Sequence, residues 1–375
     1  MLDLAARLAL RSAGDVEPNP LVGAVVARDG RVIGMGHHRR FGSQHAEREA
    51  LDDCRRRGIA PMGATMYATL EPCRHEGKQP PCVEAILEAG IPRVVIALAD
   101  PNPLSGGGAG VLRDAGIEVQ FCDESSLAMQ IAEPFVKRIT TGLPWVIAKW
   151  AQTIDGRIAT RTGRSRWISG PRARRRVHRL RARVDAIVTG IGTVRADDPL
   201  LTARDVPRVR RVARRVVVDR DLELPADSAL VRTAGQTPLI VACTSEAAAA
   251  NPARRQRLTD AGARILPVKP GRHGLDLREL LRLLVEHDDA TNVLIEAGPG
   301  LLGSFFEADL IDLAIVHQSP LLLGDESAPG PARGQVIDSL SGALDFELRR
   351  AARVGRDVEL VYRRRDPPAP ATPQA

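Results

Sequence analysis

The residues His45-Ala46-Glu47 combine a metal-binding side chain with an acid, and Pro72-Cys73 and Cys82 follow them downstream. One imidazole and two thiolates form a ligand set that suits Zn²⁺. Glu47 adds the carboxylate that such a site needs as a proton carrier. A helix that opens at His45 would point the two side chains in different directions, so that one binds metal while the other faces a substrate.

Each part of this pattern is common by itself. A lone His-Ala-Glu is also typical of a solvated helix start, and Pro-Cys has little specificity. The combination, in this order and at junctions between predicted strands and helices, predicts a zinc site, and it is typical of zinc-dependent base deaminases. The other cysteines, Cys54, Cys122 and Cys243, lack such partners, and we expect them in the core.

The composition limits the classes of protein to which the chain can belong. At 375 residues it is long enough for two domains. Apolar residues make up 44% and aromatic residues 3%, so the cores must be built from Leu, Val, Ile and Ala. The net charge of +7 comes from 53 basic residues, almost all Arg, against 46 acidic ones. This charge fits a nucleic-acid partner or an Arg-rich enzyme with a phosphorylated substrate, and we favour the second.

The cysteines and the apolar segments indicate where the protein works. Five cysteines at wide spacing do not describe a disulfide framework. The N-terminus lacks a basic segment followed by a continuous apolar run, so we expect no signal peptide. Because no apolar run approaches the length of a membrane span, we expect a cytoplasmic protein with reduced thiols.

The first 143 residues are predicted to alternate strands with helices. The expected strands are 21–27, 31–36, 64–70, 93–99 and 117–121, and Asp29-Gly30 is a hairpin turn signal. The expected helices are one that ends near residue 14, then 46–57, 82–89, 112–115 and 126–141. The zinc ligands then lie at strand ends and helix starts, where the helix dipole favours thiolate over thiol. We place the domain boundary at Gly142-Leu143-Pro144.

The second half is predicted to be α/β again. The expected strands are 145–150, 185–189, 215–219, 239–243, 265–268, 292–296, 313–318 and 358–363. One helix begins at Ser169-Gly170-Pro171 with Ser169 as its N-cap, and others cover 277–287 and 301–308. The tail, 366–375, is rich in Pro and Ala and is predicted to be disordered.

Several motifs resemble those of the bifunctional riboflavin-biosynthesis family, in which a pyrimidine deaminase is fused to a reductase. They are Pro18-Asn19-Pro20, His45-Ala46-Glu47, the long loop from Pro72 to Cys82, and Asp100-Pro101-Asn102-Pro103. The long spacer between the two cysteines differs from the short one in cytidine and tRNA-adenosine deaminases. The resemblance covers about residues 1–365. It implies a cytidine-deaminase-like α/β/α domain over 1–143 and a dihydrofolate-reductase-like α/β domain over 144–365.

The resemblance assigns roles to residues of the first domain. His45, Cys73 and Cys82 would hold zinc, and Glu47 would be the catalytic acid and base. The substrate pocket would be lined by Asn19, His38, His75, Lys78, Asp100 and Asn102. From its sequence context alone, His38 could equally be a surface histidine of a loop. Lys78, in the loop between the cysteines, is the best candidate for a contact with the substrate phosphate.

Two glycine-rich strand ends stand out in the second half, Gly190-Ile191-Gly192-Thr193 and Glu296-Ala297-Gly298-Pro299-Gly300. No G-x-G-x-x-G follows a strand there, so the sequence does not support a Rossmann fold. Either strand end could place backbone N–H groups against a diphosphate, although an ordinary turn would look the same. Together with 149–151, 153–157, 165–168 and 193–202, they resemble the reductase domain of the family, which uses NADPH.

The resemblance also assigns roles in the reductase domain. Six residues would surround the ribose phosphate: Lys149, Ser165, Arg181, Asp197, Leu200 and Arg204. Of these, Arg181 and Arg204 would clamp the phosphate bidentately. NADPH would be held by Trp167, Ser169, Thr193, Gly298, Pro299 and Gly300, and Glu296 would lie beside the reacting ribose. Most of the 18 arginines between residues 157 and 215 are expected on the surface.

The chain departs from the family pattern at a few positions. Glu17 precedes Pro-Asn-Pro where Thr or His is usual, and Arg74 stands where Ser is usual. The loop after Pro103 is one residue shorter, and Ala109 occupies a place often held by Arg. These departures concern the substrate contacts of the deaminase and leave the zinc ligands intact.

The leading interpretation is a two-activity enzyme with a small phosphorylated pyrimidine as substrate, working as a homo-oligomer (dimer or tetramer) without a nucleic-acid or membrane partner. One alternative is a deaminase of another base or nucleoside with a non-catalytic C-terminal domain. A nucleic-acid-binding or RNA-editing protein is a third. The scarcity of aromatic residues for base stacking argues against the third.

Overall fold

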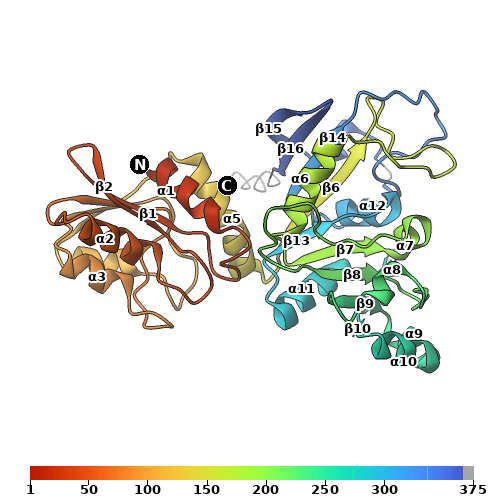
Figure 1. Cartoon of the computed structure of the whole chain (residues 1–375), viewed down its shortest axis with the longest axis horizontal. Helices are drawn as coiled ribbons and strands as arrows, with labels where there is room; N and C mark the ends of the chain where they lie inside the picture. Colours follow the sequence, from red (N-terminus) through yellow and green to blue (C-terminus); the bar gives the residue numbers. More distant parts are fainter. Residues whose placement is uncertain (273, 336, 366–375) are drawn as a thin grey trace, which may run out of the picture. The chain divides into compact units, whose positions relative to one another are not determined.

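The computed structural model describes residues 1–272, 274–335 and 337–365, so the predicted disordered tail lies outside the described residues. The chain divides into two compact units. One comprises Met1–Pro144 together with Leu284–Thr291, and the other comprises Trp145–Leu283 and the chain from Asn292 onward. Each unit is built on its own central sheet (Figure 1).

The first unit is built on a five-stranded sheet with the order β2-β1-β3-β4-β5. Its strands are β1 (Gly23–Arg28), β2 (Arg31–His37), β3 (Thr65–Ala68), β4 (Arg93–Ile96) and β5 (Glu118–Phe121). Strand β1 is antiparallel to both β2 and β3, whereas β3, β4 and β5 are parallel. The predicted turn at Asp29-Gly30 is confirmed, because both residues have the positive φ that a tight hairpin turn requires.

Helices cover both faces of this sheet (Figure 1). They are α1 (Leu2–Ala9), α2 (Ala46–Arg56), α3 (Cys82–Glu88), α4 (Gly108–Asp114) and α5 (Ser126–Thr141), with a 3₁₀ turn at Leu10–Ser12. Side chains alternate along β4: Val95 packs with α1 and α5, and Val94 packs with α2 and α3. The predicted three-layer α/β/α arrangement is therefore present.

The second unit is built on a nine-stranded sheet with the order β10-β9-β8-β7-β13-β6-β14-β16-β15. The strands are β6 (Trp145–Gln152), β7 (Ala186–Gly190), β8 (Arg214–Val218), β9 (Leu239–Cys243), β10 (Ala263–Pro267), β13 (Asn292–Ile295), β14 (Leu313–Gln318), β15 (Phe346–Val354) and β16 (Asp357–Arg364). Strands β10 to β14 in this order are parallel, and β16 and β15 add an antiparallel hairpin at one edge. The parallel strands place their carboxyl ends along one edge, where ligands bind in open α/β sheets.

The connections of the second unit are mostly helical. The helices are α6 (Pro171–Arg181), α7 (Ile191–Asp197), α8 (Ala229–Arg232), α9 (Ser245–Ala250), α10 (Pro252–Asp260), α11 (Leu277–Asp288) and α12 (Pro299–Glu307), with a 3₁₀ turn at Leu340–Gly342. The last residues of α11, from Leu284 onward, belong to the first unit. A short hairpin joins β11 (Pro270–Gly271) to β12 (Gly274–Leu275). In the hydrophobic core, Leu180 of α6 belongs to the same cluster as strand residues such as Ile187 and Leu294.

Three local predictions need correction. The N-cap of α6 is Gly170, not Ser169, and its backbone N–H donates to Asp357 Oδ2 over 2.7 Å. Helix α4 begins four residues earlier than predicted, because Gly108 can lie directly against another backbone. Strand β15 was not predicted, since five of its nine residues are exposed and Arg-rich.

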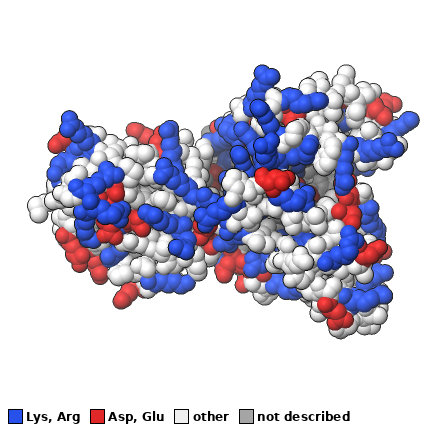
Figure 2. Space-filling view, viewed as in Figure 1, with Lys and Arg blue, Asp and Glu red and all other residues white. Residues whose placement is uncertain are grey.

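Arginine and lysine side chains are spread over the surface of both units (Figure 2). Arg215 is an exception to the expected exposure, because its side chain is fully buried in β8. It donates to Thr233 Oγ1 over 2.6 Å and reaches the carbonyl of Leu200 over 3.5 Å. Burial lowers the pKa of Arg215 to about 10. This arginine ties the loop after α7 to the sheet.

Gly108 provides a test of how α4 is fixed against the zinc-ligand turn. A Cβ at Gly108 would lie 1.9 Å from the carbonyl oxygen of Pro72, whereas a Cβ at Gly110 would meet open space. Gly108→Ala should therefore lower the free energy of unfolding by about 1–3 kcal/mol. Gly110→Ala, in the same helix, should raise it by roughly 0.5–1 kcal/mol. Urea unfolding of both variants measures this, and equal effects would contradict the close approach.

Candidate metal centre and reductase site

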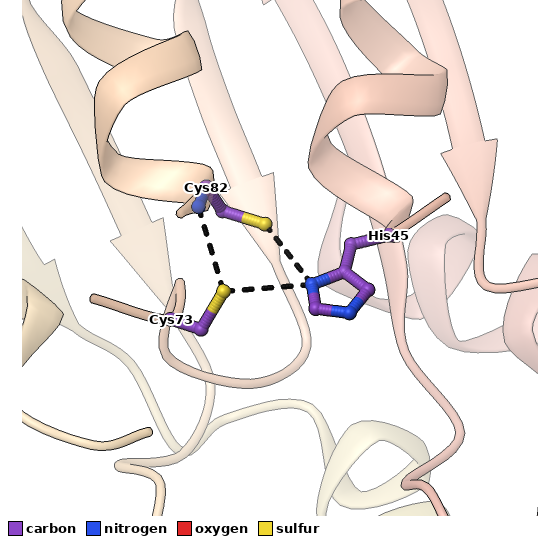
Figure 3. A group of neighbouring side chains, drawn as sticks. All are labelled: His45, Cys73 and Cys82. Atoms are coloured by element: carbon purple, nitrogen blue, oxygen red, sulfur yellow. Dashed lines mark hydrogen bonds between the residues drawn. The ribbon is translucent and has the colours of Figure 1, made fainter. Parts of the chain in front are cut away.

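Three potential metal ligands converge in the first unit (Figure 3). His45 is the N-cap of α2, Cys82 is the first residue of α3, and Cys73 lies in the turn after β3. His45 Nδ1 lies 3.3 Å from Cys82 Sγ and 3.5 Å from Cys73 Sγ. The three ligand atoms all lie within 4.8 Å of one another. The three residues predicted to form one ligand set therefore lie close enough together to bind a single ion.

The chemistry of this donor set fits a zinc ion. Hydrogen bonds with the Cys82 side chain, then with His45 and the Cys82 backbone N–H, lower the pKa of Cys73 to about 4. The hydrogen bond with Cys73, followed by burial, raises the pKa of Cys82 instead. Cys73 is therefore the more acidic thiol of the pair, and it is held beside a second sulfur and an imidazole nitrogen. Zinc is bound in proteins by this combination of ligands.

Glu47 lies in the first turn of α2, directly beside this group. Its side chain is only 3% exposed, and burial, followed by the charge of Cys73, raises its pKa to about 7. His45 and Glu47 both border the same cavity. A carboxyl group in this environment can carry a proton near neutral pH, as a general acid and base must.

The cavity beside Glu47 has a volume of about 260 Å³. Its lining includes every deaminase substrate residue implied by the family resemblance: Asn19, His38, His75, Lys78, Asp100 and Asn102. Other lining residues were not predicted from the sequence, among them Phe41, Ser43, Gln79, Ser105 and Phe135. The segments that carry them are far apart in the sequence, so only the fold reveals that they meet.

His38 is buried in the wall of this cavity, so it is not a surface histidine. Its Nδ1 lies 3.1 Å from the carbonyl oxygen of Gln44, which can only accept a hydrogen bond. A neutral ring then leaves Nε2 to accept from Asn19 Nδ2, 3.2 Å away. Burial lowers the pKa of His38, which favours this neutral form.

A buried carboxylate at Glu71 holds two loops of the cavity in place. Its Oε2 accepts from the backbone N–H of Asp100 over 3.0 Å, and its Oε1 accepts from that of Ala109 over 2.8 Å. Asp100 in turn accepts from Asn102 N over 2.9 Å and from the hydroxyl of Ser105. The sequence analysis missed this role, although an acid immediately before Pro-Cys was a visible signal.

The structure places the residues that depart from the family pattern. Both carboxylate oxygens of Glu17 accept from the backbone N–H of Gly14 at 3.0 Å, and this buried side chain does not line the cavity. Arg74 is exposed. Lys78 does line the cavity, and its Nζ lies 3.9 Å from the centre of the Phe41 ring.

The second unit contains a buried group of charges at the ends of neighbouring parallel strands. Arg181 of α6 forms a fork with Glu296, which follows β13: Nε lies 2.6 Å from Oε1, and Nη2 lies 2.9 Å from Oε2. Although burial opposes ionisation, the charge and hydrogen bonds of Arg181 lower the pKa of Glu296 to about 2. Lys149 of β6 also interacts with Glu296, and burial lowers the pKa of this lysine.

This geometry changes one expectation about the phosphate clamp. The Arg181 side chain is directed to Glu296 and to the carbonyl oxygen of Thr202, so its fork is already occupied. Arg204 is exposed, and among the described residues its guanidinium makes one long hydrogen bond, 3.5 Å, to Thr202 Oγ1. His178, which the sequence analysis missed, lies 3.2 Å from the same carbonyl of Thr202 and fixes this loop to α6.

The two glycine-rich strand ends lie side by side. Strands β7 and β13 are parallel neighbours, and the backbone N–H of Gly298 donates to Thr193 Oγ1 over 3.0 Å. Helix α7 begins at Ile191 and α12 begins at Pro299, so two helix N-termini open at this edge. Such an arrangement can hold the diphosphate of a dinucleotide.

The remaining predicted reductase residues lie in the loop before α6, at the end of α7 and in the loop that follows α7. Trp167 is 66% exposed, with the guanidinium of Arg174 4.3 Å from the centre of its ring. Ser165 and Ser169 lie on either side of it and are half-buried. Asp197 accepts from Arg166 through its backbone carbonyl, as Leu200 does from Arg215. Among the described residues, no side-chain hydrogen bond joins these loops to Thr193 or Gly298.

Comparison with known proteins agrees with both halves of this description. Residues 144–360 match the family model of the RibD C-terminal domain, and residues 1–98 match that of the cytidine and deoxycytidylate deaminase zinc-binding region. The chain belongs to the RibD family of riboflavin biosynthesis proteins. RibD of Aquifex aeolicus is 37% identical over 97% of both chains, and RibD of Escherichia coli is 37% identical over 94% of this chain and 96% of its own.

Solved structures of RibD proteins share the fold over nearly the whole chain. One form of Acinetobacter baumannii RibD has a TM-score of 0.82 and 35% identity, covering 97% of this chain and 98% of its own. A deaminase and reductase from Thermotoga maritima has a TM-score of 0.82 and 33% identity, covering 97% of each chain. The predicted family and fold class are therefore confirmed.

The chain is thus a bifunctional RibD enzyme of riboflavin biosynthesis, with a zinc-binding deaminase domain and a reductase domain of the type that uses NADPH in RibD. This confirms the predicted function class and cofactors. Within the described part of the chain, the helices are too short or too polar to cross a membrane.

The Arg181–Glu296 pair should be important for the stability of the reductase domain. The two side chains are only 13% and 11% exposed, so Glu296→Gln would leave a buried guanidinium without its counter-charge. We expect this substitution to lower the free energy of unfolding by about 3–5 kcal/mol.

The exposed pair Arg195–Glu223 offers a matched control. Its side chains are 51% and 47% exposed, and Glu223→Gln should cost at most about 1 kcal/mol. Urea unfolding, followed by a probe of the reductase domain, compares the two variants. Similar losses would mean that the buried pair has no special role in stability.

Proposed function

We propose that the first unit deaminates 2,5-diamino-6-(5-phosphoribosylamino)pyrimidin-4-one and that the second unit reduces the ribosyl group of the product to ribityl. The name of the Thermotoga maritima relative, a diaminohydroxyphosphoribosylaminopyrimidine deaminase and 5-amino-6-(5-phosphoribosylamino)uracil reductase, supports this substrate. The main structural support is the single cavity where Glu47 and two of the three zinc ligands meet all six expected substrate residues.

In the deaminase, His45, Cys73 and Cys82 are the proposed zinc ligands. Zinc with three protein ligands supplies a Lewis acid that lowers the pKa of a water molecule to about 7. The Glu47 carboxylate would accept a proton from the attacking water and pass it to the amino group that leaves as ammonia. The Glu47 side chain is suited to this proton transfer because it borders the cavity and is itself buried.

The polar residues around the cavity would orient the ring. The Asn19–His38 hydrogen bond and the Asp100–Ser105 hydrogen bond fix side chains on two loops of the wall. The Glu71 carboxylate acts as a positioning group, because it holds the Asp100 loop through the backbone. Lys78 is exposed and borders the cavity, so its ammonium group would contact the phosphate of the substrate.

In the reductase, Thr193, Gly298, Pro299 and Gly300, together with Trp167 and Ser169, are the proposed NADPH-binding residues. NADPH supplies the hydride that is added to the first carbon of the opened ribosylamine. Glu296 is ionised at neutral pH, so it would accept hydrogen bonds from the ribose and could not act as a proton donor. Lys149, buried beside it, would share this side of the substrate.

The phosphate would be held mainly by Arg204. Ser165, Leu200 and Asp197, the last residue of α7, are the further residues proposed to surround the ribose phosphate. Because Arg181 is committed to Glu296, its proposed role changes from a phosphate clamp to a positioning group for the carboxylate. Arg204 keeps the role that was expected, since its guanidinium forms no ion pair with the described residues.

Glu47→Gln tests the proton transfer in the deaminase. The variant should keep its zinc, because the three ligands are unchanged, and lose ammonia release by roughly 10²-fold or more. Zinc content and ammonia release are measured on the same preparation, with Glu49→Gln in the same helix as the control. Normal ammonia release from a zinc-loaded Glu47→Gln enzyme would remove Glu47 from the mechanism.

Arg204→Ala tests the proposed phosphate contact in the reductase. Loss of a charge-assisted contact should raise the KM for the phosphorylated pyrimidine by about tenfold or more, while the affinity for NADPH stays nearly unchanged. Arg255→Ala, an exposed arginine on α10, controls for the change in net charge. An unaltered KM would refute the phosphate contact.

Three wider expectations remain proposals. We propose that the protein works in the cytoplasm, because its metal site requires Cys73 and Cys82 as reduced thiols, and the described cysteines are all free. The predicted homo-oligomer, a dimer or tetramer, remains a prediction, and sedimentation analysis of the whole protein would measure it. The absence of a nucleic-acid partner is also still a prediction.

A further inference from the structure

A second cavity lies on the reductase unit, between α6 and the β15–β16 hairpin. Its volume is about 280 Å³, and its lining consists of Arg172, Arg175, Arg176, Arg179, Arg353, Val354 and Gly355. We call this group the arginine pocket. Figure 2 shows basic side chains gathered over the region that α6 and this hairpin occupy in Figure 1. None of these residues belongs to the proposed deaminase or reductase sites.

The spacing of the α6 arginines places them on one face of the helix. Positions 172, 175, 176 and 179 are separated by three and four residues, so their side chains are neighbours along the helix. Like charges at these spacings repel one another. Helix α6 also has no acidic residue in its first turn, so the positive end of its dipole adds to the same field.

The pocket carries more positive than negative charge. Arg176 forms an ion pair with Glu359. Burial acts to raise the pKa of Glu359, but hydrogen bonds with His317 and Arg176 lower it to about 2. Among the described residues, Arg172, Arg175, Arg179 and Arg353 have no carboxylate partner. A concave group of guanidinium groups without counter-charges is a site that an anion would stabilise.

The hairpin fixes the other wall of the pocket. Asp357 at the start of β16 accepts from the backbone N–H of Gly170, which anchors the hairpin to the start of α6. Gly355 in the turn has φ +72°, and a Cβ there would lie 3.1 Å from Arg172 Cδ. Arg353 donates through Nε to the carbonyl oxygen of Gly355 over 3.1 Å. The arginines of the hairpin and the helix therefore face one cavity on a fixed frame.

We propose that the arginine pocket binds a small-molecule oligophosphate, a chain of two or three linked phosphate groups. Guanidinium groups match phosphate oxygens bidentately, and several of them around one cavity favour a ligand with several phosphates over a single ion. The volume lies just below the usual range of small-ligand pockets, roughly 300–1,000 Å³. The linked phosphates could be an inorganic oligophosphate or part of a nucleotide, since both present the same phosphate oxygens.

Calorimetric titration of the full-length protein tests this proposal. The probes are inorganic triphosphate, a nucleoside triphosphate and inorganic phosphate, each at two concentrations of NaCl. Triphosphate should bind once per chain and more tightly than phosphate, and higher salt should weaken it. Similar affinities for the two triphosphates would identify the phosphate chain as the recognised group, and tighter nucleoside triphosphate binding would identify a nucleotide.

Arg175→Gln/Arg179→Gln is the variant that removes two unpaired guanidinium groups. It should lower the affinity for triphosphate by roughly tenfold or more, with reductase turnover and NADPH affinity unchanged. Arg255→Gln/Arg257→Gln on α10 makes the same change in net charge and should alter triphosphate affinity less than about twofold. Thermal unfolding followed by circular dichroism confirms that both variants are folded.

Several outcomes would overturn the proposal. They are no triphosphate binding at millimolar concentration, equal losses in the two double variants, an equal loss of NADPH affinity in Arg175→Gln/Arg179→Gln, and a change of oligomeric state in that variant. The third would assign the pocket to the NADPH site, and the fourth would assign it to a contact between subunits. Binding of a single-stranded RNA more tightly than triphosphate would identify a nucleic-acid surface instead.

Discussion

The contacts among one imidazole and two sulfurs determine how the first unit can work. His45, Cys73 and Cys82 come from three separate segments, yet their ligand atoms lie within 4.8 Å of one another. His45 caps the start of α2 and Cys82 opens α3, while Glu71, two residues before Cys73, holds the neighbouring loops through the backbone N–H groups of Asp100 and Ala109. The placement of a proton-carrying acid next to the metal follows from the same helix start.

The second unit holds buried charges at the edge of a parallel sheet. Arg181 and Glu296 neutralise each other at the ends of neighbouring elements, so a carboxylate can stay ionised although it is buried. The adjoining strand ends carry Thr193 and Gly298, whose hydrogen bond brings two glycine-rich turns together. In the proposed reductase mechanism, these charges would face the phosphorylated sugar and the glycine-rich turns would hold the dinucleotide.

Much of the fold and the metal site could be predicted, because their signals are local. The strand–helix alternation follows from apolar runs, and the ligand set follows from residue types whose chemistry is specific. The rest depends on contacts between distant segments. The cap at Gly170 comes from Asp357, and the burial of Arg215 depends on acceptors from Thr233 and Leu200. The commitment of Arg181 to Glu296 likewise joins residues 115 positions apart.

X-ray absorption spectroscopy at the zinc edge, on the purified full-length enzyme, tests the central claim most directly. The account predicts one zinc per chain with two sulfur ligands at about 2.3 Å, one histidine nitrogen at about 2.0–2.1 Å and one further light-atom ligand. Loss of one sulfur in Cys82→Ser, with no change in Cys122→Ser, would assign the ligands. A zinc ion without sulfur ligands, or with four protein ligands, would contradict a catalytic centre at His45, Cys73 and Cys82.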